Sequence, residues 1–184
     1  HRMSVFTPRS LDIDVVLDLM IHDLDIVLSF VKSPVEEVRA VGLPILSGKT
    51  DIANVRIEFA SGCVSNFTAS RVSTERIRKL RFFQPRQYIS IDYGRQDVVA
   101  FTVGDSSPQA TPSVNPQIGM LKPSVTSEEP LRAELRAFLD AVRRRSTPVV
   151  TLEDGRRALA LALNIVTDIH QHGSRIHLEK LTRS

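Results

Sequence analysis

Four polar side chains follow one another at helical spacing near the N-terminus: Asp18, His22, Asp25 and Ser29. Positions i, i+4, i+7 and i+11 fall on one stripe of a helix, and the residues between them, across 14–32, are mostly apolar. The stretch therefore predicts a buried helix. Burying a carboxylate or an imidazole is costly unless the group is paired, so the stripe predicts either a structural network or a functional site.

Three interpretations of this stripe are open. In the first, Asp18 accepts one imidazole N–H of His22 and leaves the other ring nitrogen for general acid/base catalysis. In the second, the same pair is structural and ties the helix to a strand. In the third, His-x-x-Asp supplies two metal ligands, but a third is needed, and His170 and His172 are better explained as partners of a helix C-terminus. We predict no metal site.

Six segments further along have the pattern of apolar and polar residues that is typical of strands: 38–41, 54–59, 63–72, 77–83, 88–93 and 98–103. Most of the turns between them are too short for parallel crossovers, which favours antiparallel neighbours. Two helices are predicted after them, at 128–145 and 151–173, the second with a capping box at Thr151. We therefore predict an α+β fold, in which an open-faced, mostly antiparallel sheet has helices packed on one face.

The chain is predicted to form a single domain over 1–184. Residues 1–11 are an N-terminal segment that precedes the helix. Residues 104–126 contain four prolines and indicate an extended arm with an edge strand near its end. A short last strand is predicted at 175–178, after the second of the two helices.

The composition excludes several functional classes. The 184 residues carry a net charge of +3 and contain eight glycines, none of which forms G-x-G-x-x-G or a P-loop. No run of 18 apolar residues occurs, so we expect a cytoplasmic protein with no membrane span. The single cysteine, Cys63, is interpreted as a buried thiol. The basic run from Arg71 to Arg86 is interpreted as a solvated strand surface rather than a nucleic-acid interface.

The segment Asp-Leu-Met-Ile-His-Asp-Leu-Asp at 18–25 resembles the Asp-x-x-x-His-x-x-Asp signature of the Gfo/Idh/MocA (glucose–fructose oxidoreductase / inositol dehydrogenase) family. The resemblance continues through 51–64 and through 134–138, Pro148 and 151–159, and covers nearly the whole chain. It corresponds to the C-terminal domain of that family. Within the family, the runs 18–25, 66–73 and 76–84 are most similar to UDP-N-acetylglucosamine 3-dehydrogenase-like members.

The resemblance implies a role for each residue of the signature. His22 is expected to be the general acid/base on a sugar hydroxyl, Asp18 to orient it or bind substrate, and Asp25 to be structural. Arg9, a few residues ahead of the helix, is a candidate contact for an anionic group of the substrate, with an ordinary surface arginine as the alternative. Because the sheet of the family commonly packs against its copy, we expect a homo-oligomer formed through the sheet face.

The sequence also departs from the family pattern. Family members begin with a Rossmann domain whose G-x-G-x-x-G binds NAD or NADP and with a Glu-Lys-Pro motif whose lysine assists the histidine, and neither motif occurs here. The resemblance therefore implies the substrate-binding and dimerisation part of an NAD(P)-dependent sugar or nucleotide-sugar oxidoreductase. Such a part, without the cofactor-binding half, is expected to be inactive alone. The alternative is a non-enzymatic sheet platform for a protein or an anionic ligand.

Overall fold

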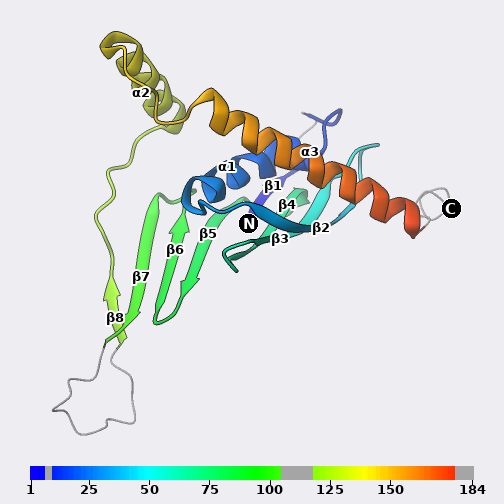
Figure 1. Cartoon of the computed structure of the whole chain (residues 1–184), viewed down its shortest axis with the longest axis horizontal. Coiled ribbons are helices and arrows are strands. Elements are labelled where there is room, and N and C mark those ends of the chain that lie inside the picture. The colour runs from blue at the N-terminus through cyan, green and yellow to red at the C-terminus, as the bar shows by residue number, and fades with distance from the viewer. Residues whose placement is uncertain (7–9, 105–117, 177–184) are drawn as a thin grey trace, which may run out of the picture. The chain divides into compact units, whose positions relative to one another are not determined.

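The computed structural model describes residues 1–6, 10–104 and 118–176. The chain divides into two compact units, one formed by His1–Ile77 and Glu134–Ser184 and the other by Arg78–Ala133. Figure 1 traces the course of the chain through both units. The first unit carries Asp18, His22 and Asp25, the described residues of the predicted site.

The first unit is built on four strands in the order β2-β3-β4-β1. These strands are β1 (Arg2–Val5), β2 (Val35–Leu43), β3 (Ile52–Phe59) and β4 (Val64–Ser73). The first three in this order are antiparallel neighbours, as the short turns predict, and β1 runs parallel to β4 with Arg2 opposite Ala69. The strand β1 was not predicted, because a strand of four residues is too short to show alternation.

Helices cover one face of this sheet. A π-helical turn, η1 (Val16–Met20), leads into α1 (Ile21–Phe30), and α3 (Leu152–Arg175) packs against both α1 and β2 (Figure 1). Alternate residues of β3 are buried: Ala53, Val55, Ile57 and Phe59. The helices add further fully or nearly fully buried side chains to this core, among them Met20, Leu24 and Ile165. The predicted α+β class, with an open and mostly antiparallel sheet, is confirmed.

The helix α3 begins where the sequence predicts and ends later. Thr151 Oγ1 accepts the N–H of Asp154 at 3.2 Å, and Asp154 Oδ2 accepts the N–H of Thr151 at 2.9 Å, which confirms the capping box. The strand predicted at 175–178 is wrong at its start, because Arg175 is the last residue of the helix. The buried Ile169 packs these last turns against the core. The helix therefore continues beyond Gly173, the residue at which the sequence predicts its end. Residues 177–178 lie outside the described residues.

Cys63 is exposed, so the prediction of a buried thiol is wrong. It follows Gly62, whose φ of +80° lies in the left-handed region, in the tight turn between β3 and β4. The N–H of Phe59 donates to the Cys63 carbonyl at 2.9 Å and closes this turn. A residue in such a turn lies outside the alternation of the strand, and therefore has no core-facing side.

The second unit contains antiparallel strands that follow one another in chain order. They are β5 (Ile77–Gln84), β6 (Gln87–Asp92), β7 (Asp97–Val103) and β8 (Ile118–Leu121). The first three confirm the predicted strands, and β8 is the edge strand expected near the end of the proline-rich arm. Residues 105–117 of that arm lie outside the described residues.

The helix α2 (Pro130–Arg144) is the amphipathic helix that the sequence predicts. Within the described part of the chain its apolar stripe is exposed: Leu131, Leu135, Phe138, Leu139 and Val142. Basic residues occupy its last turn, where they favour the negative end of the helix dipole. Among the residues that the structure describes, no helix has the length and apolar character needed to cross a membrane.

Candidate active site

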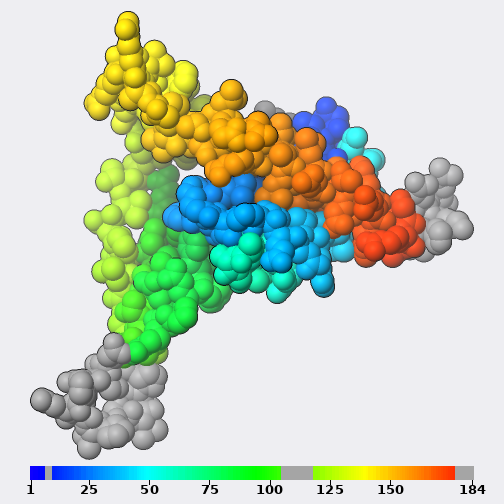
Figure 2. Space-filling view, viewed as in Figure 1, coloured from blue at the N-terminus to red at the C-terminus, as the bar shows by residue number. Residues whose placement is uncertain are grey.

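The stripe with the predicted chemistry lies on a helix that is buried on one side only. The helix was predicted to be buried nearly all round, and this is wrong. One face of η1 and α1 is buried, formed by Val16, Met20, Leu24 and Val27. On the other face, His22 is exposed, and Asp18 and Asp25 are half-buried. Figure 2 shows α1 (blue) reaching the surface of the molecule next to α3 (orange).

Asp18, His22 and Asp25 lie on this exposed side of the helix. Within the described residues, the side chains of Asp18, His22 and Asp25 form no hydrogen bond or ion pair, whereas Ser29 Oγ donates to the Ile26 carbonyl at 2.6 Å. An accessible imidazole on the same face as two carboxylates can exchange a proton with a bound molecule, and catalytic hydrogen bonds often tighten only when substrate is present. No three His, Cys, Asp or Glu residues of the described chain lie close enough to hold a metal ion. Arg9 lies outside the described residues.

A widened helical turn carries Asp18. The N–H of Ile21 donates to the carbonyl of Val16, five residues earlier, instead of to the residue four earlier. The extra residue in this turn changes the rotation of Asp18 about the helix axis relative to His22. Single π-helical turns of this kind are rare and are frequently found at functional sites. The turn is therefore part of the geometry that the candidate site presents.

A buried ion pair fixes α1 to the sheet. The guanidinium of Arg2 on β1 donates to Asp23 Oδ1 from Nε at 3.1 Å and from Nη2 at 2.7 Å. Each side chain is only 12% exposed. This pair was not predicted, although Asp23 lies three residues after Met20 and therefore on the same buried face of the helix. The carboxylate next to His22 in sequence thus holds the helix, whereas Asp25, predicted to be structural, has no described partner.

We expect Asp23→Asn to lower the free energy of unfolding by about 2–3 kcal/mol, because the change leaves the part-buried Arg2 charge unpaired. The matched control is Asp12→Asn, the same chemical change at an exposed position ahead of the helix, which we expect to cost less than about 0.5 kcal/mol. Urea unfolding followed by circular dichroism measures both values. Equal losses in the two variants would contradict the structural assignment of Asp23.

A second buried arginine lies where the helix begins. Arg71 on β4 is 5% exposed, so the prediction that it belongs to a solvated surface is wrong. Its side chain donates to the carbonyls of Ser10 and Ile13 and, at 3.2 Å, to that of Thr50. Its Nε lies 3.4 Å from Oδ1 of the fully buried Asp51. The signal for this burial is present in the sequence, because residues 67, 69 and 71 alternate onto the core face.

Asp51 is held ionised inside the protein. Burial alone would raise its pKa, but the hydroxyl of Ser47 at 2.7 Å and the N–H groups of Ser47, Ile45 and Leu46 outweigh that effect. The pKa of this carboxyl is therefore lowered to about 2. The negative charge that remains compensates the buried guanidinium of Arg71.

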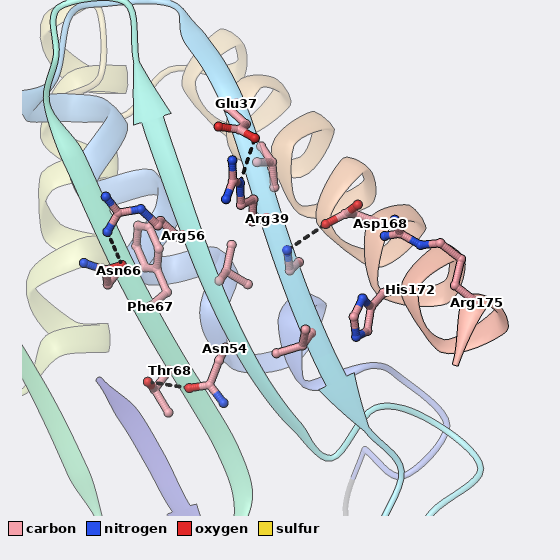
Figure 3. Close-up of a pocket in the computed structure, with 14 residues that line it drawn as sticks. Glu37, Arg39, Asn54, Arg56, Asn66, Phe67, Thr68, Asp168, His172 and Arg175 are labelled. Carbon is pink, nitrogen blue, oxygen red and sulfur yellow. Dashed lines mark hydrogen bonds and ion pairs between the residues drawn. The ribbon is translucent and has the colours of Figure 1, made fainter. Parts of the chain in front are cut away.

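The open face of the sheet forms a separate hollow. It has a volume of about 720 Å³ and is lined by residues of β2, β3 and β4, both exposed ones such as Arg39 and Arg56 and buried ones such as Ala40, together with the end of α3 (Figure 3). Asp168 on α3 accepts the N–H of Ala40 at 2.6 Å, which occupies one donor of the edge strand β2. None of Asp18, His22 and Asp25 lines this hollow. The structure therefore does not bring the predicted catalytic residues to the open sheet face.

Comparison with known proteins identifies relatives of the chain. Residues 3–90 match the family model described as GFO/IDH/MocA C-terminal domain. The UDP-N-acetylglucosamine 3-dehydrogenase of Acidithiobacillus ferrooxidans is 35% identical over 165 residues, which are 90% of this chain and 51% of that protein. The chain thus spans about half the length of this curated relative.

Solved structures also match the chain. The crystal structure of the Acidithiobacillus ferrooxidans enzyme matches with a TM-score of 0.80 at 33% identity, over 91% of this chain and 52% of that one. A complex of levoglucosan dehydrogenase with NADH and levoglucosan matches with a TM-score of 0.75 at 14% identity, over 93% and 55% of the two chains. At that identity the second likeness concerns the fold alone.

Proposed function

The chain belongs to the GFO/IDH/MocA family as a C-terminal domain, and from that premise we propose that it is the substrate-binding part of an NAD(P)-dependent oxidoreductase acting on a sugar or nucleotide sugar. The observation that carries the proposal is the exposed His22 on a helix whose opposite face is fixed by buried groups. A general acid/base must be reachable by substrate and must also be held still. The name of the relative, a UDP-N-acetylglucosamine 3-dehydrogenase, supports a nucleotide sugar as the substrate.

In the proposed reaction a sugar hydroxyl is oxidised to a ketone. The O–H proton passes to a ring nitrogen of His22, and the hydrogen on the same carbon leaves as a hydride. Asp18, which precedes His22 by four residues, orients the imidazole or accepts a hydrogen bond from a neighbouring hydroxyl. We propose that Arg9 contacts the anionic part of the substrate. The structural role of Asp25 stays a prediction.

A nicotinamide cofactor, NAD or NADP, supplies the hydride acceptor for this reaction when it is bound. The 184 residues contain no Gly-x-Gly-x-x-Gly, the loop that normally lets backbone N–H groups approach the pyrophosphate of such a cofactor. The chain corresponds to 51% of its dehydrogenase relative. We therefore propose that residues outside this chain hold the cofactor, and that this chain contributes the sugar site.

Titration calorimetry of the chain with UDP-N-acetylglucosamine tests the substrate assignment. We expect a dissociation constant between about 1 µM and 1 mM, the usual range for enzyme substrates. Asp18→Ala should weaken binding by about tenfold or more, because a charged hydrogen-bond acceptor is lost. Asp12→Ala, which removes an exposed carboxylate ahead of the helix, is the control and should bind normally. Binding of NADH without any binding of the nucleotide sugar would contradict the proposal.

We also propose that two copies of the chain associate through the open face of β2, β3 and β4. On this face Arg39 and Arg56 lie opposite each other across two strands, and each is paired with a glutamate of its own strand, at 2.7 Å to Glu37 and 3.1 Å to Glu58. The two glutamates form an acidic row next to the basic row. A twofold rotation places the acidic row of one copy on the basic row of the other, which makes the face self-complementary. Exposed Val41 and Leu43 follow on the same strand face.

We expect Arg56→Glu to convert a dimer of the chain into a monomer, because it places like charges across the proposed interface. Sedimentation velocity at physiological salt measures the mass of each form. Arg132→Glu, an equal charge change on the exposed side of α2, is the control and should leave the dimer intact. A wild-type chain that is monomeric, or an Arg56→Glu variant that stays dimeric, would exclude this face as the interface.

A further inference from the structure

The chain enters the helix of the candidate site without an ordinary cap. Val15, the residue before η1, is itself helical, and no side chain caps the first turn. Ser10, five residues earlier, has a φ of 57°, in the left-handed region that serine rarely adopts. The position of residues 10–15, the segment that enters the helix, must therefore be fixed by contacts with other parts of the first unit.

The guanidinium of Arg71 provides the central contact. It donates to the carbonyls of Ser10 and Ile13, which lie at two points of the entering segment, and to the carbonyl of Thr50 at 3.2 Å in the loop between β2 and β3. The planar guanidinium has five N–H donors and reaches all three oxygens at once. A lysine ammonium has three donors around one point and cannot reproduce this fork.

The loop that Arg71 reaches is joined to the same segment by two more hydrogen bonds. The N–H of Thr50 donates to Asp14 Oδ1 at 2.9 Å, and the N–H of Val15 donates to the Thr50 carbonyl at 2.9 Å. Asp51 orders the loop by accepting from three successive N–H groups at 2.6–2.9 Å. In addition, the N–H of Arg71 donates to the Asp51 carbonyl at 3.0 Å. Strand, loop and entering segment thus form one buried polar cluster.

We infer that Arg71 is a positioning residue for the candidate active site. The N–H of Asp18 donates to the Asp14 carbonyl at 3.1 Å, so the anchored segment continues directly into the π-helical turn that carries Asp18 and then into His22. Arg71 acts through the backbone of residues 10–18 and has no contact of its own with Asp18 or His22 among the described residues. The role in catalysis rests on the proposed function, whereas the anchoring of the segment does not.

Hydrogen exchange of Arg71→Lys, followed by mass spectrometry, tests the anchoring in this chain. We expect amides of residues 10–22 to exchange about tenfold faster, while amides of β3 keep their protection. The matched control is Arg39→Lys, the same change at an exposed position of β2, which should leave residues 10–22 unchanged. Asp14→Ala is a second variant that removes the hydrogen bond from the Thr50 N–H and leaves Arg71 and Asp51 in place, and we expect a smaller acceleration confined to the same residues.

Two outcomes of the exchange experiment would overturn the inference. One is unchanged exchange in residues 10–22 of both variants, and the other is equal acceleration across β2, β3 and β4, which indicates a general loss of stability. In the full-length oxidoreductase, Arg71→Lys should lower kcat about 10- to 100-fold and leave KM for the nicotinamide cofactor unchanged. Normal kcat in that variant, with an inactive His22→Ala variant, would exclude the positioning role. Normal kcat in His22→Ala would instead refute the proposed function and leave the anchoring to be judged by exchange alone.

Discussion

Replacing His22 by alanine is expected to lower turnover of the proposed oxidoreductase by about 10²–10⁴, the usual loss when a general acid/base is removed. The methyl group of alanine cannot accept the hydroxyl proton, so the hydride must leave from a neutral alcohol. The fold should be almost unaffected, because His22 is exposed and has no described partner. We therefore expect a change in unfolding free energy within about 0.5 kcal/mol.

Steady-state kinetics with the nucleotide sugar, together with thermal unfolding, separate catalysis from structure at this position. Ser29→Ala is the matched control, since Ser29 follows on the same stripe and already donates to the Ile26 carbonyl. We expect this control to turn over normally. A His22→Ala variant that keeps a near-normal rate but melts at a clearly lower temperature would support the alternative of a non-enzymatic platform with a structural histidine.

The second large effect is expected at Asp51. Asp51→Asn should lower the free energy of unfolding of the chain by about 3–5 kcal/mol, because it leaves the buried Arg71 charge without compensation. The side-chain amide of the variant also brings its own N–H donors next to the backbone N–H groups of Ile45 and Leu46, which donate to the carboxylate in the unmodified chain. Chemical denaturation at neutral pH measures the loss. Asp12→Asn, at an exposed position, is the control and should be neutral.

The pH dependence of stability provides an independent check on Asp51. Its pKa is about 2 in the folded protein, below the ordinary aspartate value of 3.8. The folded state binds this proton less readily than the unfolded state does. The contribution of the carboxylate to the free energy of unfolding is therefore complete above about pH 4 and is lost as the pH falls towards 2. The shift corresponds to about 2 kcal/mol. Asp51→Asn should lack this part of the acid dependence, and an unchanged acid profile would contradict the assigned state of the carboxylate.

The parts of the fold with a local signal were predictable from the sequence. In β3 the alternation of apolar residues with Asn54 and Arg56 determines which side is buried, and the structure has the same sides. The capping box of α3 depends on two residues three positions apart, Thr151 and Asp154. The helical spacing of Asp18 and His22 placed both on one face for the same reason.

Features that depend on distant partners were not predictable. Asp23 has the helical phase of a buried residue, but its partner Arg2 belongs to β1, which has no sequence signal of its own. The alternation of residues 67, 69 and 71 indicates that Arg71 is buried, but nothing local indicates its three carbonyl partners, which come from two other segments. The π-helical turn at Asp18 likewise depends on how the entering segment is anchored, and a period of 3.6 residues cannot indicate it.

In the proposed function, His22 exchanges a proton with a hydroxyl of a bound sugar. A crystal structure of the full-length protein with UDP-N-acetylglucosamine tests it most directly. We predict a ring nitrogen of His22 within hydrogen-bond reach, about 2.6–3.2 Å, of the hydroxyl that is oxidised, with Asp18 on the same side of the sugar. A nucleotide sugar bound away from α1, with His22 facing solvent, would contradict the account.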